Sequence, residues 1–244
     1  MINQVKLTPR NSVFPVARIL NSKVLESYQE AIKSYGEKAR ESLDIFRDIN
    51  GYLAGSNCFA PIVLRNLLPK NSRLATMADL GLATEINPDF LRGFYSDTGL
   101  TLRTERDSYK PYNFLANDLA KQLKKRGMPL KEGMPKVIYF DALDLRENTD
   151  SHCGLVYELN EKAKLGENII DAPELTRNFR FKTIDERGIP IEDNDGSRIL
   201  YAGDGGVSRF YLGRSSDLDS GSRGLADSGG DGRVVVVGVP EESK

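Results

Sequence analysis

The sequence predicts an α+β fold with two main helices and many short strands, in one or two domains. In the first half of the chain, apolar residues recur at helical spacing in two segments. In the second half, apolar and polar residues alternate and turn signals follow one another closely, which is typical of short strands. The chain then reaches four consecutive valines, Val234 to Val237, the pattern of a strand buried on both faces. With 244 residues, of which 39% are hydrophobic, the chain can bury a sizeable core.

The first predicted strand covers residues 13–20, where short apolar runs surround Pro15. Proline suits the beginning or the edge of a strand, because it cannot donate a backbone hydrogen bond. Ser22 then has the side chain of a good helix N-cap, and apolar residues at helical spacing continue to about residue 48. This pattern predicts one long amphipathic helix.

Residues 50–110 show no single period. Thr76 and Asn87, which precedes a proline, are residue types that open helices, so a short helix is expected after each. Residues 100–104 are expected to form a strand.

The second main helix is predicted between Pro111 and Gly127. Proline is favoured in the first turn of a helix, basic residues are favoured near its end, and glycine is a common stop. Further strands are expected at residues 137–145, 154–159, 179–183 and 198–201, and between turn signals at 187–190 and 193–196.

The last fifth of the chain has an unusual composition. From Asp193 to Pro240 there is no Lys, Glu, Gln, Met or Trp. The residue types present between Gly203 and Val239 are Gly, Asp, Ser, Arg, Ala, Val, Leu, Phe and Tyr. All of them can be reached from an asparagine codon by replacing only its adenines, and the missing types cannot. The pattern indicates a segment written by adenine-directed mutagenesis.

A flexible tail is the alternative interpretation of this segment. Residues 202–233 contain 9 Gly, 6 Ser and 5 Asp, as a linker does. Apolar residues interrupt the stretch, however, and a solvated tail has no reason to carry them. The chain also returns to a buried strand at its end. We therefore expect the segment to be held between fixed points and displayed on a folded scaffold.

Residues 206–237, GVSRFYLGRSSDLDSGSRGLADSGGDGRVVVV, resemble the C-terminal variable region of archaeal diversity-generating retroelement variable proteins. The resemblance is weaker at residues 99–103, 113–123 and 154–156. It implies a single C-type-lectin-like domain of mostly antiparallel strands, in which the first and last strands, here those at 13–20 and 233–239, pair and the later strands and loops present variable side chains. The chain is longer than a minimal domain of that fold, so residues 50–110 are expected to be an insertion or a separate subdomain. The resemblance also implies that a reverse transcriptase copies a template with errors at adenines, and that the copy replaces the end of the gene.

Motifs for calcium-dependent sugar binding are absent from the sequence, because there is no Glu-Pro-Asn or Trp-Asn-Asp run and no tryptophan. The stretch Asp193-Asn-Asp-Gly196 resembles part of a calcium loop but lacks its flanking ligands, so a plain turn is expected. Gly203-Asp-Gly-Gly206 lacks the Lys-Ser/Thr of a phosphate loop. No metal or cofactor is therefore expected.

The two cysteines and the single histidine are interpreted as structural. Cys58 and Cys153 are too few for a disulfide framework and have no metal-ligand motif around them. His152 and Cys153 are adjacent, and neighbours on a strand point to opposite faces, which disfavours a shared catalytic site. An enzyme of unrecognised chemistry stays an alternative function.

The net charge and the first residues of the chain argue against a nucleic-acid-binding, exported or membrane-spanning protein. A formal net charge of −1 gives no electrostatic reason to bind nucleic acid. Residues 1–20 mix basic residues and prolines with short apolar runs, so neither a signal peptide nor a membrane span is expected. The expected state is a monomer, cytoplasmic by default.

The leading functional hypothesis is a non-enzymatic binding protein with a hypervariable surface, whose partner is a protein or a cell-surface ligand. An interaction protein with a flexible Gly/Ser tail is a further alternative. The framework is expected to include Val207, Leu212, Leu218, Leu225 and Arg233. The candidate ligand-binding residues, expected to face solvent, are Ser208, Phe210, Tyr211, Gly213, Arg214, Ser216, Asp217, Asp219, Ser222, Asp227 and Asp231.

Overall fold

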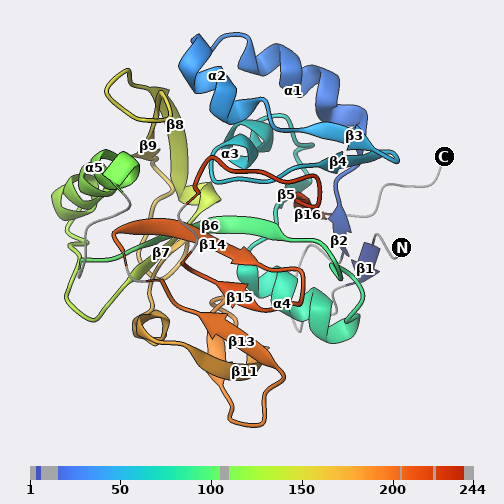
Figure 1. The fold of residues 1–244 in the computed structure, drawn as a ribbon, viewed down its shortest axis with the longest axis vertical. Helices are drawn as coiled ribbons and strands as arrows, with labels where there is room; N and C mark the ends of the chain where they lie inside the picture. Colours follow the sequence, from blue (N-terminus) through green and yellow to red (C-terminus); the bar gives the residue numbers. More distant parts are fainter. Residues whose placement is uncertain (1–3, 7–15, 105–109, 204, 222–223, 239–244) are drawn as a thin grey trace.

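The computed structural model describes residues 4–6, 16–104, 110–203, 205–221 and 224–238. It confirms the α+β class, with short helices and many antiparallel strands (Figure 1). Two sheets carry most of the strands, and two small hairpins complete the described part. The four-stranded sheet has the order β1-β2-β16-β5, and the eight-stranded sheet has the order β10-β7-β6-β14-β15-β13-β11-β12.

The valine strand lies inside the four-stranded sheet, as the sequence predicts. β16 (Val235–Gly238) runs antiparallel to β2 (Val16–Ile19) on one side and to β5 (Ser72–Leu74) on the other. Val235 is opposite Ile19, and all four residues of β16 are buried. β1 (Gln4–Lys6) completes the sheet beside β2. The pairing expected between the strand at 13–20 and the valine strand is therefore confirmed over these residues, although β1 precedes β2 in the chain, and Pro15 lies outside the described residues.

The eight-stranded sheet carries the unusual segment. Its strands are β6 (Ser96–Leu102), β7 (Lys136–Tyr139), β10 (Ile169–Asp171), β11 (Phe179–Ile184), β12 (Pro190–Glu192), β13 (Arg198–Tyr201), β14 (Val207–Leu212) and β15 (Leu218–Asp219). β14 pairs antiparallel with β6 along its whole length, whereas β13 and β15 pair in parallel. The segment that follows residue 206 thus begins as an interior strand of a sheet.

The prediction of one long helix after Ser22 is wrong. The chain instead forms a 3₁₀ turn η1 (Ser22–Val24), α1 (Leu25–Ile32) and, after a break, α2 (Glu37–Leu43). Gly36 is extended at the N-cap of α2, with ψ 161°, so the helical path is interrupted although the apolar spacing continues. η1 itself is capped by Asn21, whose side chain accepts from the backbone N–H of Lys23.

The other predicted helices have mixed outcomes. Thr76 caps α4 (Met77–Ile86) in a capping box with Asp79, as expected for this residue type. Asn87 opens only a turn, in which its side chain accepts from the backbone N–H of Asp89. The second main helix is confirmed as η2 (Lys110–Tyr112) followed by α5 (Asn113–Lys125), and Gly127 takes a positive φ of 75° after it. The remaining helices are α3 (Ala60–Arg65), η3 (Phe140–Ala142) and η4 (Pro173–Thr176).

The strand expected at 137–145 is two strands, because η3 turns the chain between β7 and β8 (Leu143–Glu147). β8 forms a hairpin with β9 (Leu155–Leu159), and β3 (Arg47–Ile49) forms another with β4 (Tyr52–Ala54). Residues 50–104 supply β5 to one large sheet and β6 to the other. Their interpretation as an insertion stays a prediction.

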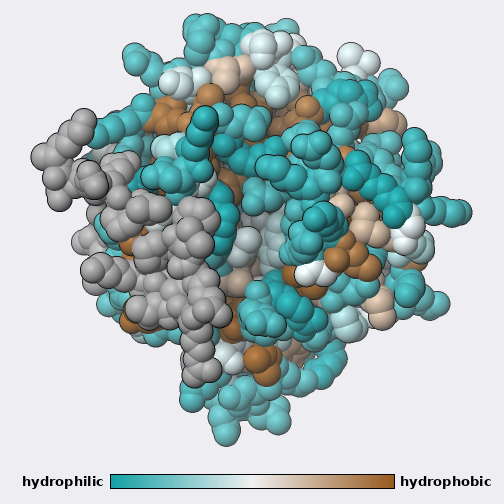
Figure 2. All heavy atoms as spheres, turned by 180° about the vertical axis from the view of Figure 1, so that it is seen from behind, coloured by the Kyte–Doolittle hydropathy of each residue, from teal (hydrophilic) through white to brown (hydrophobic). Residues whose placement is uncertain are grey.

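Buried apolar residues gather in two clusters, one under α1, α3, α5 and the β8–β9 hairpin and the other under α4 and the eight-stranded sheet. Both cysteines are buried and unpaired, in agreement with their structural interpretation. On the face shown in Figure 2, hydrophilic residues predominate and apolar ones are exposed in smaller areas between them. Among the described residues, no helix is both long and apolar enough to cross a membrane.

Candidate ligand-binding groove

In strand β14, alternate residues of the unusual segment point to opposite faces of the sheet. Successive residues of a strand point to opposite faces. Phe210 and Leu212 belong to the core under the eight-stranded sheet, whereas Arg209 and Tyr211 point to the other side and line a groove. The exposure expected for Ser208 and Phe210 is therefore wrong, because their relative exposures are 5% and 0%.

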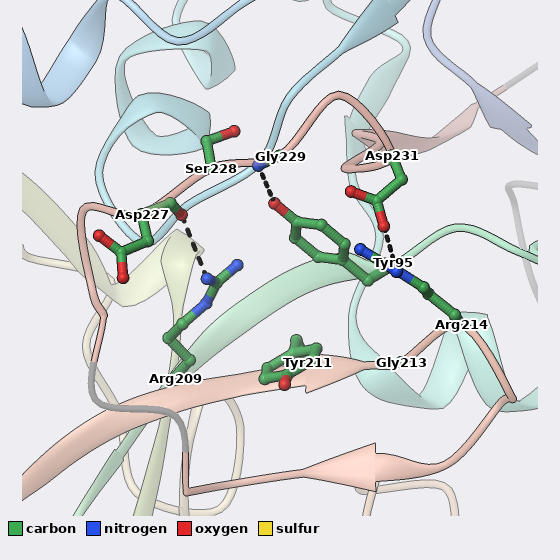
Figure 3. Close-up of a pocket in the computed structure, with 9 residues that line it drawn as sticks. All are labelled: Tyr95, Arg209, Tyr211, Gly213, Arg214, Asp227, Ser228, Gly229 and Asp231. Atoms are coloured by element: carbon green, nitrogen blue, oxygen red, sulfur yellow. Dashed lines mark hydrogen bonds and ion pairs between the residues drawn. The ribbon is translucent and has the colours of Figure 1, made fainter.

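The groove lies between the end of β14 and the loop at residues 227–231 (Figure 3). Its cavity volume is about 420 Å³. The residues that line it are Tyr95, Arg209, Tyr211, Gly213, Arg214, Asp227, Ser228, Gly229 and Asp231. In Figure 3, Arg209 and Tyr211 come from the strand, the residues from Asp227 to Asp231 come from the loop opposite, and Tyr95 reaches toward that loop from the chain before β6.

Arg209 joins the strand, the loop and the neighbouring strand β6. Its Nε and Nη2 donate to the two carboxylate oxygens of Asp97, at 2.7 and 2.6 Å. Its other N–H groups donate to the carbonyls of Asp227 (3.1 Å), Gly224 (3.4 Å) and Ser56 (3.4 Å). A guanidinium has five N–H donors, so each one has an acceptor here and Arg209 holds backbone rather than offering a free donor to the groove.

The charges of this pair are almost completely buried, since the Arg209 and Asp97 side chains are 7% and 0% exposed. Burial lowers the pKa of Arg209, but the charge and the hydrogen bonds of Asp97 outweigh it, and the pKa is raised overall. The Ser56 hydroxyl adds a hydrogen bond of 2.7 Å to Asp97. A buried pair with this many partners fixes geometry strongly, because removing one partner leaves an uncompensated charge.

Two tyrosines flank the Arg209 guanidinium. Its central carbon lies 5.2 Å from the ring centroid of Tyr95 and 5.0 Å from that of Tyr211. The two rings meet edge to face at 6.0 Å. The Tyr95 hydroxyl donates to the carbonyl of Ser56 (3.0 Å) and accepts from the backbone N–H of Gly229 (2.9 Å). Tyr95 thereby positions the loop as well as forming the groove wall.

At the open end of the groove, Arg214 forms an ion pair with Asp231. The Arg214 side chain is 67% exposed and that of Asp231 is 24% exposed, so water screens this pair in part and its contribution to stability is small. The turn that carries Arg214 is closed by two backbone hydrogen bonds, from Gly213 to the carbonyl of Asp217 (2.7 Å) and from Ser216 to that of Gly213 (3.0 Å). Ser216 has a φ of 64°, in the left-handed region.

Asp217 and Asp219 hold backbone instead of lining the groove. Asp217 accepts from the backbone N–H of Ile199 (2.7 Å), which lies on β13. Asp219 accepts from the Tyr211 hydroxyl (3.1 Å) and from the backbone N–H of Gly221 (2.6 Å). Burial, followed by the nearby charge of Asp219, raises the pKa of Tyr211, so its phenol stays protonated at neutral pH.

The structure thus places some candidate ligand-binding residues in the groove and others elsewhere. Five of them line the groove: Tyr211, Gly213, Arg214, Asp227 and Asp231. Arg214 and Ser216 also line a second hollow of about 550 Å³ between the Gly213–Asp217 turn and α4. Ser222 lies outside the described residues. The expected framework positions Val207, Leu212, Leu218, Leu225 and Arg233 are all buried, as predicted.

Sequence reasoning missed four groove residues, which are Tyr95, Arg209, Ser228 and Gly229. The alternation of β14 carried a signal for Arg209, because it is two residues from Tyr211 and must share its face. Nothing in the sequence marks Tyr95, which precedes the segment by more than a hundred residues and reaches it through the pairing of β6 with β14 and through its own backbone bridge to Gly232.

The turn expected at Asp193 is present in the structure. Asp193 starts a turn, with its side chain accepting from the backbone N–H of Asp195 (2.9 Å) and its carbonyl from that of Gly196 (2.9 Å). Burial raises the pKa of the Cys153 thiol to about 11, which suppresses its reactive thiolate form. Within the described part of the chain, no three His, Cys, Asp or Glu side chains are grouped so that they could hold a metal ion.

Comparison of the chain with models of protein families, with curated proteins and with solved structures gives no match.

Proposed function

We propose that this chain is a non-enzymatic, ligand-binding variable protein of a diversity-generating retroelement, and that the groove beside β14 is its binding surface. The observation that carries the proposal is a division of labour. All groove side chains except that of Tyr95 come from the segment with adenine-limited composition, while residues outside the segment hold the backbone of the groove loop. The Tyr95 hydroxyl accepts from the backbone N–H of Gly229, and the Tyr95 backbone bonds to the backbones of Asp231 and Arg233. A site can vary only if other residues hold its backbone.

The groove also has the properties of a binding site. Its volume of about 420 Å³ lies in the range of small-molecule pockets, and an aromatic wall beside charged and small residues is the composition of many paratopes. Tyr211 provides apolar area at low conformational cost, because the Tyr95 ring and the Arg209 guanidinium already hold it in place. Asp227 and Arg214 project from opposite sides of the groove and would read charge on a partner.

We extend the proposal to the fold family and the partner. The antiparallel pairing of β2 with β16 supports a C-type-lectin-like domain, since that fold joins its first and last strands. The partner proposed is a protein or a cell-surface ligand bound by a monomer. Neither calcium nor another cofactor is required for the contacts proposed.

The gene tests this proposal directly. The 3′ end of the gene and its flanking DNA are sequenced, and a near-repeat of codons 203–239 is sought beside a reverse transcriptase gene. We expect mismatches only where the template has adenine. Differences spread over all four bases, or a locus without any such repeat, would contradict diversification by a retroelement.

A further inference from the structure

Six glycines of the segment fall into two groups by the space around them. For each one, the contacts of an added Cβ atom show whether a side chain fits. Gly213, Gly229 and Gly230 have no backbone atom closer than 3.4 Å to that position, and we name them the open glycines. Gly203, Gly221 and Gly232 would each meet backbone within 3.0 Å, and we name them the crowded glycines.

The crowded glycines lie where two backbone stretches touch. A Cβ on Gly232 would be 2.5 Å from the backbone nitrogen of Ser56, and one on Gly203 would be 2.5 Å from the Cα of Gly221. Real Cβ contacts are never this short, so the chain itself would have to move. The carbonyl of Gly232 also accepts from the backbone N–H of Gly55 (2.9 Å), which ties this stretch to the end of β4. These positions therefore require glycine.

The open glycines have room. The nearest atom to a Cβ on Gly213 is the carbonyl oxygen of Asp217 at 3.4 Å, and on Gly230 it is the Ile49 side chain at 3.7 Å. On Gly229 the close neighbour is a carboxylate oxygen of Asp231 at 2.6 Å, the end of a side chain that can rotate away. None of the three has a positive φ, so their conformation does not require glycine either.

We propose that Gly213, Gly229 and Gly230 are specificity-determining positions of the groove, and that Gly203, Gly221 and Gly232 are fixed. This proposal rests on the proposed function of the groove. Gly213 and Gly229 line it from the strand side and the loop side, and Gly230 continues the loop toward β3. Side chains at these positions would fill the groove or build its rim. In this copy of the protein their absence keeps the groove open.

Single cysteine substitutions test the geometry. Gly213→Cys, Gly229→Cys and Gly230→Cys are compared with Gly203→Cys, Gly221→Cys and Gly232→Cys for melting temperature and for reaction with DTNB. The native thiols give a low background, because Cys58 and Cys153 are buried and burial raises the pKa of both. We expect the open positions to react at least tenfold faster than the native thiols, with melting temperatures within a few degrees of the parent.

The crowded variants are expected to melt much lower or to fail to fold. A large side chain gives the second check, because Gly213→Tyr and Gly230→Tyr should keep the parent melting temperature if the space is real. Unfolding of these tyrosine variants, slow reaction of the open cysteines, or full stability of the crowded variants would each overturn the assignment.

A library tests specificity. Codons 213, 229 and 230 are randomised in the full chain, displayed on phage and selected against hen lysozyme as an arbitrary protein target. A matched library randomises Glu161, Lys162 and Glu186, which are exposed and outside the groove. We expect binders from the first library only, and at least a tenfold loss of affinity when their three positions are returned to glycine.

Binding that survives this reversion, or equal enrichment of both libraries, would refute a role of the open glycines in specificity. That result would leave the retroelement proposal standing if the gene has its adenine-limited repeat. Conversely, a gene without a repeat would remove the proposed function, while the thiol and stability results would still stand on the geometry.

Discussion

Strand β14 and the loops beside it have the same limited set of residue types, yet they have opposite roles in the structure. In β14, Phe210 is fully buried and is part of the core. In the loops, Arg214 and Asp227 are exposed and point to water. The adenine-directed change that we propose for this segment would act on codons and take no account of burial. The comparison therefore shows that composition marks the segment, whereas packing decides which of its positions can vary without loss of the fold.

Among the buried framework residues, substitution of Val235 should cause the largest loss of stability. This residue is 2% exposed in a strand with a neighbour on each side. Val235→Asp would bury an unpaired charge and should cost several kcal/mol, enough to prevent soluble expression of a marginally stable domain. The matched control is Gly230→Asp in the groove loop, which should melt within a few degrees of the parent. Equal thermal stability of the two variants would reject the central position of β16.

Within the segment, the contrast is sharpest between two adjacent aromatic residues. Phe210→Ala should lower the free energy of unfolding by about 3–5 kcal/mol, because it leaves a cavity in the core. Tyr211→Ala should cost clearly less, since Tyr211 lies at the groove wall and keeps contact with water. Urea unfolding of both variants measures the difference. A larger loss for Tyr211→Ala would show that the two faces of β14 are assigned the wrong way round.

These predictions also show what the sequence could establish about the fold. The valine strand and helix α5 were predictable, because a run of valines and a helical period with a glycine stop are local signals. The break between α1 and α2 was not, because the apolar spacing continues through Gly36 and only the extended conformation of that residue ends the helix path. The turn at Asn87 likewise has a helix-opening residue and no helix.

The site was predictable only in part, for a physical reason. Treating Leu212 as framework already implied that Phe210 is buried, since the two share a face of the strand. That implication was available from the sequence alone. In contrast, the contacts of Tyr95 and Asp97 with Arg209 depend on the pairing of β6 with β14, and no local pattern records which distant strands become neighbours.

The next prediction concerns the buried pair of Arg209 and Asp97 beneath the groove, which we call the clamp. Asp97→Asn removes the charge that compensates the buried Arg209 but keeps one acceptor, so the cost should be about 3 kcal/mol, the low end for a broken buried pair. Asp231→Asn breaks the exposed pair with Arg214 and should cost less than about 1 kcal/mol. Chemical unfolding at neutral pH compares the two.

The double variant Asp97→Leu with Arg209→Met adds a control, because it removes both charges together and should recover most of the stability lost in Asp97→Asn. Its groove loop should nevertheless exchange amide hydrogens faster than that of the parent, since the carbonyls of Gly224 and Asp227 lose their donor. A loss no greater for Asp97→Asn than for Asp231→Asn would contradict the clamp.

The smallest expected change in melting temperature concerns Ser216, where the backbone conformation of the loop limits which residues are tolerated. Its φ of 64° costs a residue with a side chain about 1 kcal/mol, and a β-branched residue more. Ser216→Gly should therefore raise the melting temperature slightly, by up to about 3 °C for a chain of this size, and Ser216→Val should lower it by a similar amount or more. Differential scanning calorimetry resolves both shifts. A valine variant as stable as the glycine variant would mean that the turn relaxes freely. If the order holds, position 216 accepts Asn, Asp, Gly and Ser far better than Val among the residues that an asparagine codon can reach, so backbone conformation restricts the repertoire even where the side chain has room.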